Sequence, residues 1–169
     1  MEWLSFLEKG IWFGFAAIGF AILFNVPPRT LFIIWLLAAL GGLTKLYLFH
    51  FGVSVVLSSL GGASLIGLLS IQAAHNKHAP PLVFSIPAVI PMVPGVFAYK
   101  MMLGLIKLAG DSGIDSGQVL SDTISNGIKT MFILMALAVG VAIPMLVTGK
   151  SSVKHIKLRK KKQRELHKS

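Results

Sequence analysis

The sequence predicts an all-α, polytopic integral membrane protein with about five transmembrane helices. The 169 residues are 54% hydrophobic and 13% charged, and their mean hydropathy is +0.77, which is typical of membrane proteins. The apolar residues also gather in five segments of about 20 residues or more, the length that a helix needs to cross a bilayer. The fourth segment is broken by Pro87, Pro91 and Pro94-Gly95.

The segments define one transmembrane domain over residues 1–149, followed by a basic tail over residues 150–169. The spans are expected at residues 3–24, 30–49, 52–74, 82–108 and 127–148. Gly110–Asn126 is the only polar connection of any length. Met1–Gly10 carries two glutamates and one lysine, so it lacks the basic leader of a secretory signal.

The net charge of +10 is concentrated in the tail, because nine of the sixteen Lys and Arg residues lie in Lys150–Ser169. A basic segment directly after an apolar span is a topology determinant and an anchor for anionic lipids. We therefore expect a cytoplasmic tail, an outside N-terminus and no nucleic-acid partner. The loops that carry Arg29 and His75–His78 then fall on the cytoplasmic side.

The prolines of the fourth segment interrupt the hydrogen bonds of a regular helix. Each proline lacks the N–H that would bond to the carbonyl four residues earlier, which predicts free carbonyls at Val83, Pro87 and Ile90. In lipid such groups cost several kcal/mol each unless protein or water satisfies them. Transporters place substrate sites at broken helices of this kind.

A functional break would expose both kinds of backbone group. Freed carbonyls near Pro87, Pro91 and Pro94 would bind a cation or an ammonium group. The N–H groups after Gly95 would bind an anion, assisted by the helix dipole. An amino acid needs both. The alternative is a kinked span whose free groups are met by neighbouring helices.

Four polar side chains could join such a site. Lys100 could hold a substrate carboxylate and Tyr99 could donate a hydrogen bond, although both residues also suit the outer membrane interface. Lys45 is a similar case nearer the end of its helix. Glu8 is the candidate proton site, since it lies within the first span if that helix begins at Trp3; an interfacial position is the alternative.

Small residues recur every four positions in two spans, a spacing that lets helix backbones approach closely. They are Ser59, Ala63 and Gly67 in the third span, and Ala136, Gly140 and Pro144 in the fifth. These faces could pack within the chain or against a partner.

Enzymatic chemistry is not expected. The chain has no cysteine, and its sequence shows no converging set of catalytic side chains. Gly110-Asp-Ser-Gly113 matches the tetrapeptide around a chymotrypsin-type serine, but it lies in a short loop without that fold. His75 and His78 have no evident third ligand. We therefore predict no metal and no cofactor.

The segment Ile86–Gly95, followed by Tyr99, resembles the proline-rich signature of the threonine/serine exporter family. The likeness is greatest to the small membrane subunit of the split, two-component form. It extends over the glycine-rich second and third spans, the Pro80-Pro81 entry and the final span. Met92 stands where the family usually has leucine, and the basic tail is unusually long.

The resemblance implies a subunit of a secondary-active exporter in the bacterial inner or plasma membrane. Threonine and serine are the substrates that name the family, and dicarboxylates such as succinate suit the split form. A larger membrane partner would supply a second set of about five spans. The alternative is a non-transporting assembly subunit whose proline-rich helix forms the partner interface.

Overall fold

The structure, a computed structural model, describes residues 2–77, 79–110 and 116–166, and every regular element in these ranges is helical. The elements are α1 (Glu2–Leu23), η1 (Pro28–Thr30), α2 (Leu31–His50), α3 (Val55–Lys77), α4 (Pro81–Val89), η2 (Ile90–Met92), α5 (Gly95–Ala109) and α6 (Ser116–Leu166). η1 and η2 are single 3-10 turns. The predicted all-α class is confirmed.

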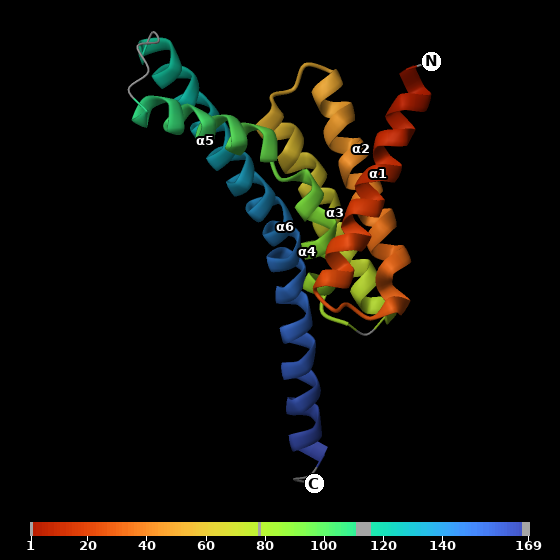
Figure 1. Ribbon diagram of the computed structural model, residues 1–169. Coiled ribbons are helices and arrows are strands. Elements are labelled where there is room, and N and C mark those ends of the chain that lie inside the picture. Colours follow the sequence, from red (N-terminus) through yellow and green to blue (C-terminus); the bar gives the residue numbers. More distant parts are fainter. Residues whose placement is uncertain (1, 78, 111–115, 167–169) are drawn as a thin grey trace.

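Within the described ranges, four segments are long and apolar enough to cross a membrane unbroken: Leu4–Leu23, Pro28–His50, Val55–Lys77 and Gly117–Thr148. Pro81–Met92 and Gly95–Ala109, which meet at an angle of 54°, satisfy the same criteria when they are taken together as one bent span. The predicted polytopic architecture with a broken fourth span is therefore confirmed. The N-terminus and the C-terminus lie at opposite ends of the molecule, as an odd number of crossings requires (Figure 1).

α6 begins at Ser116, so much of the polar connection expected over Gly110–Asn126 is helical. Polar side chains in this part of α6 fit within the helix because they donate hydrogen bonds to backbone carbonyls one turn earlier. Thr123 Oγ1 donates to the Val119 carbonyl at 2.6 Å, and Asn126 Nδ2 donates to the Asp122 carbonyl at 2.8 Å. Asp111, Ser112 and Gly113 of the Gly110–Gly113 motif, together with His78, lie outside the described residues.

Two sharp turns join the first three helices. Asn25, after α1, has a φ of 54°, and Gly52, after α2, has a φ of 81°. Glycine and asparagine adopt this left-handed conformation at lower cost than other residues. The chain can therefore reverse direction within a few residues, and α1, α2 and α3 pack as successive antiparallel neighbours.

α4 lies at the centre of the bundle, in contact with α1, α2 and α3. Its Phe84 and Ala88 side chains are fully buried in the core. α6 packs along α3 on the other side, through the small residues singled out in the sequence. A Cβ added to Gly140 would lie 2.8 Å from the Ala63 Cβ, and one added to Gly67 would lie 2.9 Å from the Val141 carbonyl oxygen.

α5 and the first part of α6 form a two-helix arm that extends away from the other helices (Figure 1). The two helices approach closely at Gly104, where an added Cβ would overlap the Thr123 side chain. The break between η2 and α5 is thus the point at which the fourth span leaves the bundle and enters the arm.

Candidate functional site

The broken span contains four prolines, and each has a different structural role. Pro81 starts α4, where a missing N–H costs nothing, and Pro87 lies inside the helix. At Pro91 the chain tightens into the 3-10 turn η2. Val93 then adopts an extended conformation (φ −58°, ψ 135°), because the residue before a proline is pushed out of the helical region by Pro94.

The backbone groups freed by this break differ from the expected ones. The Ile90 carbonyl accepts a 3.0 Å bond from the Val93 N–H, so the prediction that it lacks a donor is wrong. The tighter 3-10 turn supplies the bond that an α-helix would have lost. The Met92 carbonyl, two residues later, is the one that receives a partner from outside the segment.

That partner is Lys45 of α2, whose Nζ donates a 2.9 Å hydrogen bond to the Met92 carbonyl oxygen. The side chain is half-buried and reaches across the bundle to the end of η2. At about 1.5 Å per residue, the helix from Pro81 to Met92 rises roughly 18 Å. The bond therefore lies that far along the fourth span from its start at Pro81.

Glycine at position 62 allows the three elements around this bond to approach. A Cβ added to Gly62 of α3 would lie 2.6 Å from the Met92 Cε and 3.3 Å from the Lys45 Cβ. It would also lie 2.6 Å from the Gly41 carbonyl oxygen of α2. α2, α3 and η2 thus meet closely at the lysine.

On the other side of the break, α5 restarts at Gly95 with two N–H groups unpartnered. The Gly95 N–H donates to the Val93 carbonyl at 2.9 Å, and the Ala98 N–H to the Pro94 carbonyl at 3.2 Å. The N–H groups of Val96 and Phe97, between them, have no partner among the described residues, and no side chain caps the helix. Such N–H groups carry the positive end of the helix dipole.

The predicted motif residues lie at this break, with different exposures. Pro87 and Pro94 are buried, and Pro91 is half-buried. Gly95 is exposed, and a Cβ added to it would meet nothing within 4 Å. The prolines therefore shape the packed part of the break, while Gly95 lies at its open part.

Tyr99 and Lys100 lie further along α5 and are both exposed, Tyr99 by 63%. Lys100 lines a small pocket of about 230 Å³ between α5 and α6, together with Asp122 and Asn126. The structure thus places Lys100 in the arm, whereas Lys45 is the lysine that bonds to the backbone of the break.

Glu8 lies within the first candidate span, and its carboxylate accepts a 3.4 Å bond from the Trp12 Nε1. Both residues are exposed. Gly10 and Gly14 of the same helix face α2, since added Cβ atoms there would meet Leu43 and Trp35. Glu8 lies on the opposite, outward face of α1.

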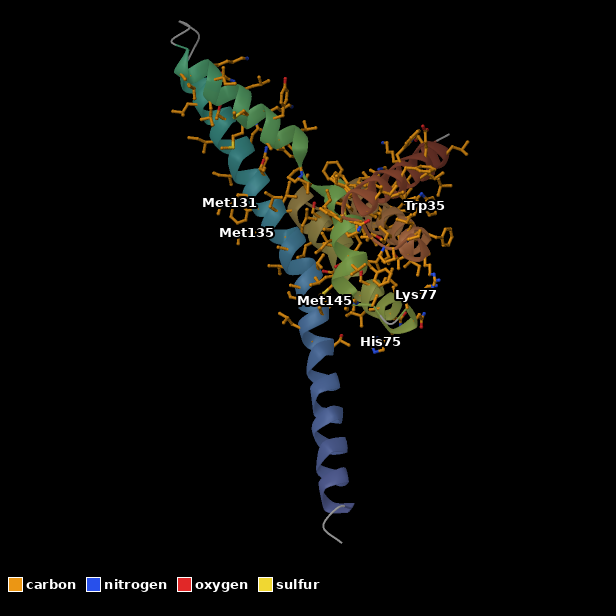
Figure 2. All side chains as sticks on the ribbon, turned by 60° about the horizontal axis from the view of Figure 1, so that its bottom comes forward. Trp35, His75, Lys77, Met131, Met135 and Met145 are labelled. Atoms are coloured by element: carbon orange, nitrogen blue, oxygen red, sulfur yellow. The ribbon has the colours of Figure 1, made fainter. Side chains whose placement is uncertain are left out.

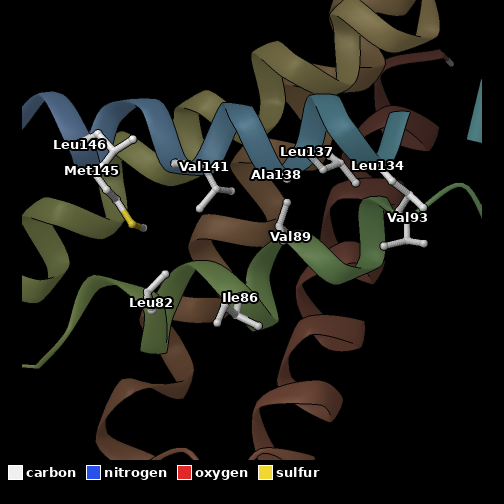
Figure 3. Close-up of a pocket in the computed structure, with 11 residues that line it drawn as sticks. Leu82, Ile86, Val89, Val93, Leu134, Leu137, Ala138, Val141, Met145 and Leu146 are labelled. Atoms are coloured by element: carbon white, nitrogen blue, oxygen red, sulfur yellow. The ribbon is translucent and has the colours of Figure 1, made fainter. Parts of the chain in front are cut away.

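A groove of about 520 Å³ runs beside the broken span, between α4 and α6 (Figure 3). Its walls are apolar throughout, from Leu82 and Ile86 of α4 to Leu137 and Met145 of α6. An apolar groove offers a polar solute no hydrogen bonds, so it suits lipid or a partner helix better. Among the residues that the structure describes, no three His, Cys, Asp or Glu side chains come together as metal ligands.

Sequence reasoning ranked Lys45 below Lys100, assigned Ser59 only to helix packing, and did not select Ser85. The hydroxyls of Ser59 in α3 and Ser85 in α4 are fully buried without a partner in the described part of the chain. The available signal for Lys45 was its place in an apolar helix, four residues after Gly41-Gly42. Its reach to Met92 depends on tertiary packing.

These features define a polytopic α-helical membrane protein with the discontinuous helix typical of transporters. The chain belongs to the threonine/serine exporter family: the family model described as "Threonine/Serine exporter, ThrE" matches residues 9–147. A protein of Haemophilus influenzae, described only as an uncharacterized protein, is 36% identical over 144 residues. That match covers 85% of this chain and 48% of the relative. No solved structure matches the chain.

Proposed function

We propose that this chain is a subunit of a secondary-active exporter of small polar metabolites, with threonine, serine or dicarboxylates such as succinate as cargo. Family membership supports export. The observation that carries the proposal is the broken fourth span, which ends at Met92 and restarts at Gly95 with polar backbone at both ends of the break. Discontinuous helices near the middle of the bilayer hold substrate in transporters.

The break offers two kinds of contact to a zwitterionic or anionic solute. The N–H groups of Val96 and Phe97 suit a carboxylate, because they are unpartnered donors at a helix N-terminus. Pro87, Pro91 and Pro94 keep the two half-helices from joining. Tyr99 and Lys100, exposed further along α5, would contact the solute on its way out. Transport would proceed by alternating access around the break.

The proposed exporter includes a larger membrane partner. The chain spans about half the length of the relative that it matches, so a second portion of similar length accompanies this unit there. The apolar α4–α6 groove and the arm of α5 and α6 leave apolar surface for such a partner. Glu8, on the outward face of α1, would relay protons at a contact with it.

The proposed orientation in the bacterial inner membrane places the basic tail in the cytoplasm, next to anionic lipid. His75 and Lys77 lie at the end of the bundle from which the C-terminal part of α6 extends (Figure 2). The α1–α2 connection, which carries Arg29, lies at the same end (Figure 1). The basic loops and the tail therefore share one side. Enzyme and fluorescent-protein fusions at each terminus would test this orientation.

The proposal is tested by efflux from preloaded cells, measured for threonine, serine and succinate in parallel. Cells would contain this chain alone, this chain with its candidate larger partner, or neither. We expect export only when both chains are present, and the preferred solute identifies the substrate class. No export of any solute, with both chains verified in the membrane, would contradict the proposal.

A second candidate function is assembly without a solute pathway in this chain. The apolar walls of the α4–α6 groove favour it, because they would bind a helix rather than a polar solute. Crosslinks from the neighbours of Pro91 to the partner, unaffected by added substrate, would support this alternative. Substrate protection of the same positions would support transport.

A further inference from the structure

We propose that Lys45 is the residue that recognises the carboxylate of the transported solute. The inference rests on the proposed function and names the side chain that would contact the solute. The main support for this proposal is the position of the Lys45 ammonium group, which is hydrogen-bonded inside the bundle to the Met92 carbonyl at the break.

Lys45 carries its positive charge inside the helical bundle. An ammonium group among apolar helices is costly unless it is paired with an anion. In the part of the chain that the structure describes, no carboxylate oxygen is paired with Lys45; its bonded partner is a neutral carbonyl at 2.9 Å. An intramembrane charge of this kind marks a substrate or ion pathway.

The Lys45 ammonium also has hydrogen-bonding capacity left for a ligand. An ammonium group has three N–H donors, and one of them is used on the Met92 carbonyl. Two donors remain for a carboxylate, whose two oxygens can accept both. The bond to Met92 therefore positions the ammonium without saturating it.

The backbone that follows Met92 also favours an anion. Met92 is the last residue of η2, and the unpartnered N–H groups of Val96 and Phe97 follow at the start of α5. They favour the same charge on a ligand as Lys45 does. Gly62 keeps α3 close to the stem of the lysine, which fixes where the ammonium lies. The charge of Lys45 and the N–H groups at the start of α5 both favour an anion as the ligand.

The simpler role for Lys45 is structural, as a cap for the Met92 carbonyl. Lys45→Gln separates the two roles, because an amide N–H can still donate to a carbonyl but carries no charge. Lys45→Arg keeps the charge. Lys107→Gln is the matched control, since Lys107 is an exposed lysine at the far end of α5.

The test uses inside-out vesicles from the native host, which supplies any partner, with the chromosomal gene replaced by each variant. We expect Lys45→Gln to raise the KM for threonine and succinate about tenfold or more, as for loss of a charged contact. Lys45→Arg should stay within about threefold of wild type, and Lys107→Gln should equal it. Immunoblots check that each variant reaches the membrane.

A chemical rescue keeps the test decisive if Lys45→Gln is unstable. The chain has no cysteine, so Lys45→Cys introduces its single thiol. Treatment with 2-aminoethyl methanethiosulfonate attaches a new ammonium and should restore transport, whereas the neutral methyl reagent should not. Wild-type vesicles treated with both reagents control for cysteines elsewhere.

The outcomes separate the two proposals. If wild type transports solute and Lys45→Gln has an unchanged KM, the proposed role of Lys45 is overturned, while the proposed function of the protein is not. The role of Lys45 is also overturned if neither reagent reacts with Lys45→Cys, or if the charged and the neutral reagent restore transport equally. An absence of transport in wild-type vesicles, equal to a gene deletion, would overturn the proposed function and this inference with it.

Discussion

Glycine serves opposite purposes in two regions of this molecule, the α3–α6 contact and the break in the fourth span. At Gly140 an added Cβ would lie 2.8 Å from the Ala63 Cβ and 2.9 Å from the Leu60 carbonyl oxygen. At Gly95 it would meet nothing within 4 Å. Gly140 allows α3 and α6 to pack closely, whereas Gly95 leaves space where α5 begins. Fold and function can therefore be disturbed separately.

The largest expected effect is from Gly140→Leu, which breaks the closed region. Because a backbone carbonyl of α3 blocks the new side chain, α3 and α6 must separate. We expect a loss of stability of about 1–3 kcal/mol or more, with efflux falling as the folded protein is lost. Thermal unfolding in detergent measures it, with exposed Val139→Leu on α6 as control. A wild-type melting temperature would contradict the close contact.

Gly95→Leu should abolish efflux while leaving membrane insertion intact. The open space accommodates the side chain, so stability should change by no more than about 0.5 kcal/mol. The leucine would occupy the space through which solute reaches the break. Efflux and thermal unfolding are measured on the same preparation. Normal efflux from a stable variant would rule out the site assignment.

Glu8→Gln should have an intermediate effect that is specific to energy coupling. The side chain lies within the first span on the outward face of α1, remote from the packed face of that helix. If Glu8 relays protons, the variant should retain solute exchange but lose the response to an imposed pH gradient. A response equal to wild type would exclude Glu8 as the proton site.

The smallest expected effect is from Tyr99→Phe. Tyr99 is 63% exposed and lies in the arm, one turn beyond Gly95. Removing an exposed hydroxyl typically changes stability by about 0.5 kcal/mol or less, and we expect efflux to fall by about twofold at most. If Tyr99→Phe lost as much efflux as Gly95→Leu, the substrate site would have to lie further along α5 than the break.

Much of the fold could be predicted because the bilayer constrains it so strongly. Span lengths, the break at Pro87–Gly95 and the small faces around Gly67 and Gly140 follow from local sequence. The start of α6 at Ser116 could not be predicted, because the polar side chains of Thr123 and Asn126 donate hydrogen bonds to carbonyls of the preceding turn and so fit within a helix.

The site was less predictable than the fold. Sequence spacing identified the prolines. It did not predict that the 3-10 turn at Ile90–Met92 would give the Ile90 carbonyl a donor and leave the Met92 carbonyl to accept a bond from Lys45. The pairing of Lys45 with Met92 joins residues far apart in the chain. Such a contact depends on how α2, α3 and η2 pack around Gly62, which no local pattern encodes.

The most direct test of the account is whether water and solute reach the break. A Val96→Cys variant of this cysteine-free chain places one thiol at the start of α5, where Val96 is 66% exposed. We predict reaction with a charged maleimide in native membranes, slowed by threonine or succinate, while Val139→Cys on the surface of α6 stays unreactive. An unreactive Val96→Cys, or labelling that no solute slows, would contradict a transport site at the break.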